Sequence, residues 1–235
     1  MGRLLTLGIL GACACAALAS AEARHDEVAD GNAQSTGSIS GTITTSAKGL
    51  APVRVTIDQK ICGPELPDHA IVVDGQGHLA NAVVMLSGFK PFGSLPDTTV
   101  VNEKCHFAPR VQIARPNSNV RTTSKDPILL TTNAQLENGK TIFNVALPIA
   151  GLNVSKRIGG AGTVRLSCNT HPWMRGWLVV TDEAAAISGP DGRFSLENIP
   201  PGTYQLRVWH ESLKSAPQKV TVVAGKATPL SVQIK

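Results

Sequence analysis

The stretch Val164-Arg-Leu-Ser-Cys168-Asn-Thr-His171-Pro-Trp-Met174, followed by Gly176-Trp-Leu-Val-Val180, predicts two strands joined by a tight loop. Val164, Leu166 and Cys168 recur at a period of two, which places them on one face of the first strand. The thiol of Cys168 is therefore expected to point inward where the loop begins. Pro172 stiffens the loop, because its ring fixes the backbone φ angle.

Cys168, His171 and Met174 follow one another at intervals of three residues, so a thiolate, an imidazole and a thioether can meet at one point. These are donors that copper prefers, and a trigonal Cys/His set with a long axial Met is a geometry used for electron transfer. The loop is therefore a candidate copper site with Cys168, His171 and Met174 as ligands.

This loop resembles the copper-binding loop of cupredoxins, in particular the short, amicyanin-like form Cys-x-x-His-Pro-x-Met. The resemblance implies a Greek-key β-sandwich in which Cys168, His171 and Met174 are the thiolate, imidazole and axial thioether ligands. The family also has an upstream histidine shortly after an Asp-Pro pair. In the corresponding run, Ser124 to Asn133, Asp126-Pro127 is present but Leu130 stands where the histidine is expected.

The beginning of the chain has the pattern of a secretory signal peptide: Met1-Gly-Arg3, an apolar run from Leu4 to Leu18, and small residues before Ala21. We expect residues 1–21 to be removed on export to the periplasm or an equivalent compartment. Residues 22–37 are polar and aperiodic, as in a flexible leader. Leu10-Gly-Ala-Cys13 supports an alternative, a lipid anchor at Cys13.

Removal of the signal leaves Cys62, Cys105 and Cys168. An odd number of cysteines in an oxidising compartment suggests one disulfide and one thiol with another role. Since Cys168 lies in the ligand loop, Cys62 and Cys105 are the expected disulfide pair; three unpaired thiols are the alternative.

The rest of the chain predicts an all-β protein, because short alternating runs are separated by Gly, Pro, Asn and Asp turns and no long helical period occurs. We expect a first domain over residues 38–182 and a second over residues 183–235. Ala82-Val-Val-Met-Leu86 is continuously apolar, which predicts a strand buried on both faces. No segment after the signal is apolar and long enough to span a membrane.

The last section carries Asp191-Gly-Arg-Phe194 and Pro200-Pro-Gly-Thr-Tyr204, which resemble the carboxypeptidase regulatory-like, transthyretin-like β-sandwich family. That family is a non-catalytic domain. Its first strands resemble residues 38–57, so this segment is an alternative member of the second domain. The whole chain resembles exported proteins of the methylamine-utilisation or plastocyanin-like type, in which the cupredoxin precedes Trp-His-Glu, here Trp209-His210-Glu211.

A further donor would be needed to complete a trigonal Cu(II) site. The candidates are Asn133 and the other histidines of the exported chain, namely His25, His69, His78, His106 and His210.

The sequence contains neither a Gly-x-Ser-x-Gly elbow nor His-Glu-x-x-His, and no paired-carboxylate motif, so we do not expect an enzyme. The absence of a Lys/Arg run and the low aromatic content argue against nucleic-acid binding. The expected function is copper binding or one-electron transfer with a redox protein partner. The alternative is a metal-free envelope protein that keeps the fold for binding or scaffolding.

Overall fold

The structure of the protein is a computed structural model that describes residues 35–91 and 97–235. Within these residues nearly all regular structure is β-strand, as the sequence predicts, and α1 (Gln59–Cys62) is a single short helix. The expected signal peptide, the leader up to residue 34, Cys13 and His25 lie outside the described residues. Among the described residues, no helix has the length and apolar character needed to cross a membrane.

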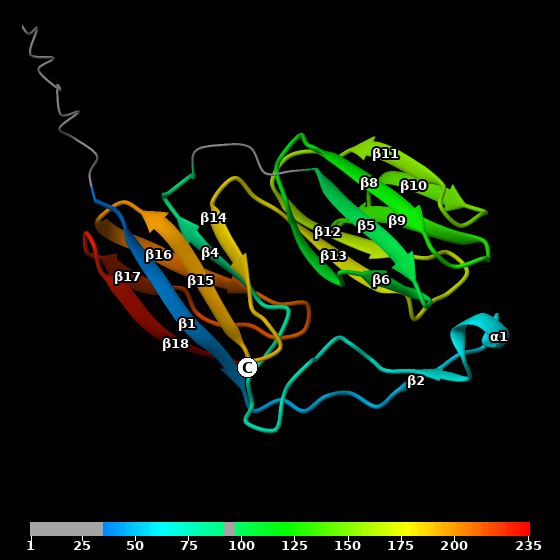
Figure 1. Ribbon diagram of the computed structural model, residues 1–235, viewed down its shortest axis with the longest axis horizontal. Helices are drawn as coiled ribbons and strands as arrows, with labels where there is room; N and C mark the ends of the chain where they lie inside the picture. The colour runs from blue at the N-terminus through cyan, green and yellow to red at the C-terminus, as the bar shows by residue number, and fades with distance from the viewer. Residues whose placement is uncertain (1–34, 92–96) are drawn as a thin grey trace, which may run out of the picture. The chain divides into compact units, whose positions relative to one another are not determined.

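One pair of sheets forms the Cys168 sandwich, with strand orders β10-β9-β12-β13-β7 and β11-β8-β5-β6 (Figure 1). Its strands are β5 (Thr98–Glu103), β6 (His106–Ala108), β7 (Val111–Ala114), β8 (Asn119–Ser124), β9 (Leu130–Leu136), β10 (Thr141–Leu147), β11 (Asn153–Arg157), β12 (Gly162–Ser167) and β13 (Arg175–Val180). Most neighbours are antiparallel, whereas β13 pairs with β7 and β5 with β8 in parallel. Val100 and Val120 of one sheet share a buried core with Leu166 and Leu178 of the other, so the two sheets pack face to face.

The other pair forms the C-terminal sandwich, with strand orders β15-β1-β18 and β14-β4-β16-β17. Its strands are β1 (Gly37–Thr45), β4 (Val83–Ser87), β14 (Ala184–Ile187), β15 (Arg193–Ile199), β16 (Gly202–Trp209), β17 (Gln218–Val222) and β18 (Ala227–Ile234). Ile39 and Ile43 of β1 pack with Val84, Leu206 and Val232 in its core. Figure 1 shows β1 lying between β15 and β18.

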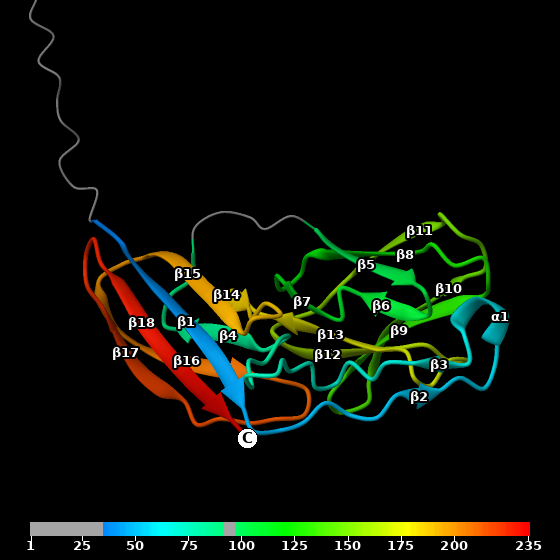
Figure 2. The same cartoon turned by 60° about the horizontal axis from the view of Figure 1, so that its bottom comes forward.

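The sheet pairing differs from the expected division at residues 182 and 183. Both β1 and β4 belong to the C-terminal sandwich, although they precede the Cys168 sandwich in the chain. Residues 38–57 contain two alternating runs around Ser46-Ala-Lys-Gly49, which predict a hairpin, but no hairpin forms; only the first run joins the C-terminal sandwich, as the alternative assignment of this segment expects. Their first part is β1, whereas β2 (Val53–Arg54) pairs with β3 (Glu65–Leu66) beside the Cys168 sandwich (Figure 2). The last two alternating runs, on either side of Gly225, predict a second hairpin, but β17 pairs with β16 and β18 with β1.

The apolar run at β4 explains why this strand lies where it does. Val84 and Leu86 face the core of the C-terminal sandwich, whereas Val83 and Met85 pack against Val111 and neighbouring residues of the Cys168 sandwich. The predicted burial of both faces is thus confirmed, because each face meets a different core.

Gly41 lets the central strand β1 fit between its neighbours. A Cβ atom at this position would overlap the carbonyl oxygen of Leu230 and lie 2.9 Å from the ring of Phe194. We expect Gly41→Ala to lower the free energy of unfolding by roughly 1–3 kcal/mol, the usual cost of overpacking, as measured by urea denaturation. Gly75→Ala is the control, since a Cβ there meets nothing within 4 Å. Equal stability of the two variants would contradict the tight fit of β1.

The tripeptide Trp209-His210-Glu211 lies where the two sandwiches meet. Trp209 packs edge-on against Trp177 of β13 with ring centroids 5.6 Å apart. Both carboxylate oxygens of Glu211 accept hydrogen bonds from the Arg110 guanidinium, at 2.7 and 2.8 Å. Burial lowers the pKa of His210, so its imidazole is neutral at pH 7. The tripeptide therefore has a structural role at this junction.

Candidate metal centre at Cys168

The loop between β12 and β13 brings two of the predicted ligands together. Cys168 follows the last residue of β12, and a hydrogen bond of 2.9 Å from the Met174 N–H to the His171 carbonyl closes the turn before β13. Cys168 Sγ then lies 3.4 Å from His171 Nδ1. Both residues are buried, with 5% and 0% of their surfaces exposed.

Two threonines surround the sulfur of Cys168 with hydrogen-bond donors. The Thr131 N–H lies 3.4 Å from Sγ, and the hydroxyls of Thr131 and Thr170 each lie 3.5 Å from it. Burial raises the pKa of the thiol, but hydrogen bonds from the Thr131 and Thr170 side chains and backbones outweigh burial and lower the pKa to about 6. Cys168 is therefore mainly a thiolate at neutral pH, the form that binds metals.

The imidazole of His171 is held by partners on both nitrogens. Its Nε2 lies 3.0 Å from Asp58 Oδ2, and its Nδ1 lies 2.9 Å from the Thr170 hydroxyl. Since a carboxylate only accepts, we assign the proton to Nε2, which leaves the Nδ1 lone pair facing the sulfur and the Thr170 hydroxyl; the single Thr170 proton is donated either to Nδ1 or to the sulfur. Trp173 packs edge-on against the ring at a centroid distance of 5.2 Å. A carboxylate on the outer nitrogen is the arrangement that orients metal-binding histidines in proteins.

Met174 and Leu130 occupy the same buried core as Cys168. Met174 is 1% exposed and Leu130 is fully buried at the start of β9. The residue after Leu130 is Thr131, whose N–H points at the Cys168 sulfur. The Leu130 side chain thus lies in the core that contains the thiol, and a hydrocarbon offers no donor to a metal. That Cys168, His171 and Met174 act as ligands stays a prediction.

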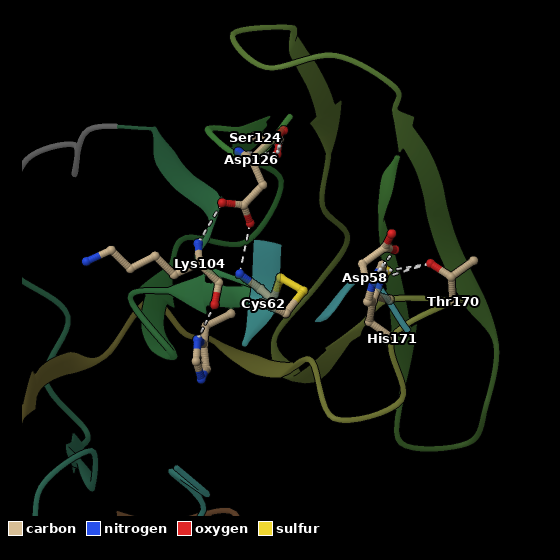
Figure 3. The surroundings of a disulfide bond; sticks show 10 residues. Asp58, Cys62, Lys104, Ser124, Asp126, Thr170 and His171 are labelled. Carbon is tan, nitrogen blue, oxygen red and sulfur yellow. Dashed lines mark hydrogen bonds and ion pairs between the residues drawn. A yellow bond between two sulfur atoms is a disulfide. The ribbon is translucent and has the colours of Figure 1, made fainter. Parts of the chain in front are cut away.

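The expected disulfide between Cys62 and Cys105 is present, with a Cα–Cα distance of 5.5 Å. Asp126, which precedes the expected histidine position, accepts hydrogen bonds of 2.8 Å from the backbone N–H groups of Lys104 and Cys105. Figure 3 shows Asp126 on one side of the disulfide and the Asp58–His171 pair on the other.

The alternative donors make other contacts, although Asn133 Oδ1 and His106 Nε2 are buried without a hydrogen-bond partner. His69 stacks on His106 with centroids 5.0 Å apart, and His78 pairs with Asp74. Asn133 donates to Asn169, and His210 lies at the junction of the sandwiches. Within the described part of the chain, no three His, Cys, Asp or Glu side chains gather into a metal-binding group.

Sequence reasoning missed the residues that support this centre. Thr131 and Thr170 flank positions that the motif identifies, so the motif could have suggested them. Asp58 lies 113 residues from His171 and adopts a left-handed backbone conformation with φ 52°. No local pattern at Asp58 indicates a partner so far along the chain.

One family model matches the C-terminal part of the chain, including the Cys168 loop. Residues 161–235 match the sequence model of a family described as the carboxypeptidase regulatory-like domain. A search of curated proteins finds no significant match.

Cupredoxins are among the similar solved structures. A purple cupredoxin from Nitrosopumilus maritimus is 21% identical over 36% of this chain and 100% of its own, with a TM-score of 0.33. The reduced state of an amicyanin mutant is 16% identical over 42% of this chain and 98% of its own, also with a TM-score of 0.33. The reduced Cu(I) form of another amicyanin mutant, at pH 4, is 17% identical over 42% of this chain and 98% of its own, with a TM-score of 0.32.

Proposed function

We propose that this protein binds copper as Cu(I), with Cys168 and His171 as the principal ligands and Met174 as a third donor. The observation that carries the proposal is the 3.4 Å approach of the Cys168 sulfur to His171 Nδ1. The lowered thiol pKa and the Asp58 contact on Nε2 leave both atoms ready to donate to a metal. Thiolate and thioether are soft donors, which suit Cu(I) better than Cu(II).

The position of Leu130 favours the reduced ion over a blue-type Cu(II) centre, because the second imidazole of a trigonal site is replaced by a buried hydrocarbon. We therefore propose that the main role of the protein is to bind copper. One-electron transfer to a protein partner would require a further donor to coordinate the ion. The disulfide supports export to the periplasm or a similar compartment, because such bonds persist where conditions are oxidising. The role is binding rather than catalysis.

The second candidate is a metal-free binding or scaffold protein. It is favoured by the complete burial of Leu130 in the core that contains Cys168 and Met174. In that case the loop would serve to hold the sandwich together, with Trp173 covering its end.

Cys168→Ser should abolish high-affinity Cu(I) binding by the purified protein, measured by competition with a colorimetric Cu(I) chelator. Loss of an outer-shell partner weakens metal binding by up to roughly 100-fold, so loss of the thiolate ligand itself should weaken Cu(I) binding by more than that. Met174→Leu should weaken binding to a smaller extent. Met85→Leu is the matched control, because Met85 is also buried but packs against Val83, Val111 and Val179.

Wild-type protein that competes no better than Cys168→Ser would support the metal-free scaffold instead. Equal weakening by Met174→Leu and Met85→Leu would remove Met174 from the ligand set.

A further inference from the structure

Residues 53–66 form a compact loop, here called the clasp, beside the Cys168 loop. The clasp is closed at its base by the pairing of Val53 with Leu66 and Arg54 with Glu65. Its tip is the helix α1, where the N–H groups of Ile61 and Cys62 each bond the carbonyl of Asp58 at 2.9 Å. Val55, Cys62 and Leu66 pack into the core of the Cys168 sandwich, whereas residues 56–61 at the tip are exposed.

The first anchor of the clasp is covalent. Cys62, at the end of α1, is joined to Cys105 between β5 and β6. Cys105 is itself held by the Asp126 carboxylate. The anchor therefore connects the tip of the clasp to the turn between β5 and β6 in the Cys168 sandwich; Figure 3 shows this disulfide.

The second anchor is the contact of Asp58 with His171. The Asp58 side chain is 42% exposed, whereas that of His171 is only 1% exposed. The carboxylate thus stands between the imidazole Nε2 and the solvent, at 3.0 Å from the nitrogen. Trp173 packs against the same ring. Asp58 therefore covers the Nε2 edge of the imidazole on its solvent side.

We infer that the clasp is a gate over His171: Asp58 positions the imidazole and covers its outer edge, and the Cys62–Cys105 disulfide keeps it there. The part of this inference that concerns metal exchange rests on the proposed function. The shielding of His171 is independent of the proposed function. A site closed in this way keeps its ion and exchanges it slowly, because exchange must wait for a local opening. The clasp therefore favours copper retention over rapid electron transfer through the His171 edge.

The gate can be tested without metal by diethyl pyrocarbonate modification at constant pH, followed by mass spectrometry of individual histidines. His78 is the internal reference, since its side chain is 28% exposed. We expect His171 to react at least roughly tenfold more slowly than His78 in the wild type, because opening of the clasp limits access. The double variant Cys62→Ala with Cys105→Ala should remove most of that protection.

Asp58→Ala keeps the test decisive if the double variant does not fold, because the disulfide stays in place. It should also speed modification of His171. Glu65→Ala is the control, because Glu65 is an exposed acidic residue of the same clasp and pairs with Arg54 as part of a two-stranded sheet, which does not need its side chain. Reaction of wild-type His171 as fast as His78, or no acceleration in Asp58→Ala, would overturn the gate.

A second experiment measures the rate at which Cu(I) passes from the Cu(I)-bound full-length protein to an excess of chelator. Release should be at least roughly tenfold faster from Asp58→Ala than from the wild type or Glu65→Ala, since the clasp opens more readily. Equal release rates would overturn the gate for metal exchange. Shielded His171 in a protein that binds no Cu(I) would refute the proposed function alone. Tight Cu(I) binding with a freely reactive His171 would refute the gate alone.

Discussion

Leu130→His is expected to give the protein an intense thiolate-to-Cu(II) absorption band that the wild type lacks. Leu130 is fully buried, and the next residue hydrogen-bonds the Cys168 sulfur. An imidazole here would supply the second nitrogen of a trigonal Cys/His/His site with Met174 as axial donor. The measurement is a visible spectrum after addition of one equivalent of Cu(II).

The same substitution should destabilise the metal-free protein. A polar ring buried without a hydrogen-bond partner costs about 1–3 kcal/mol by protein mutational data. Copper should restore this loss, so the variant should gain more in Tm on metal addition than the wild type. The loss of stability without metal and the gain in Tm with copper have one cause, which is the replacement of a hydrocarbon side chain by a metal-binding imidazole in the core that contains the thiol.

Leu86→His is the matched control, because Leu86 is equally buried but lies in the core of the C-terminal sandwich. It should lose stability without gaining colour. A wild type that is already coloured, and that Leu130→His leaves unchanged, would show that Leu130 does not occupy the ligand position. Colour in Leu86→His would mean that the band does not come from the Cys168 centre.

The sequence predicted the features that depend on local pattern. Alternation predicted β-strands, the apolar run of residues 82–86 predicted a strand buried on both faces, and cysteine arithmetic predicted the Cys62–Cys105 disulfide. Alternation shows which side chains share a face, but it does not name the neighbouring strand. The resemblance to a known family placed residues 38–57 with the C-terminal sandwich as an alternative, and β1 does lie there, but its pairing with β15 and β18 could not be derived from alternation.

The candidate centre also has features that the sequence predicts and features that depend on long-range contacts. The interval of three residues between Cys168 and His171 is a local property, and the structure places their donor atoms 3.4 Å apart. The protection of His171 depends instead on Asp58, which reaches the imidazole because β2 pairs with β3 and Cys62 bonds Cys105. These are long-range contacts. Sequence reasoning could identify the candidate ligands but not the clasp residue, Asp58, that contacts His171.

Arg110→Met is expected to cost about 3–5 kcal/mol of unfolding free energy, the usual effect of removing one partner from a buried ion pair. The side chains of Arg110 and Glu211 are only 11% and 6% exposed. The variant would leave the Glu211 carboxylate buried at the junction of the sandwiches without its two guanidinium bonds. Urea denaturation followed by tryptophan fluorescence reports the change, because Trp177 and Trp209 lie at the same junction.

The double variant Arg110→Met with Glu211→Gln should recover much of this loss, because no unpaired charge stays buried. Lys125→Met is the surface control. The Lys125 and Glu103 side chains are 62% and 37% exposed, so breaking that pair should cost less than about 1 kcal/mol. Equal, small losses in Arg110→Met and Lys125→Met would show that water reaches the Arg110–Glu211 pair, and that Glu211 of the Trp-His-Glu tripeptide does not hold the sandwiches together. A large loss confined to the single Arg110 variant would assign that role to this ion pair.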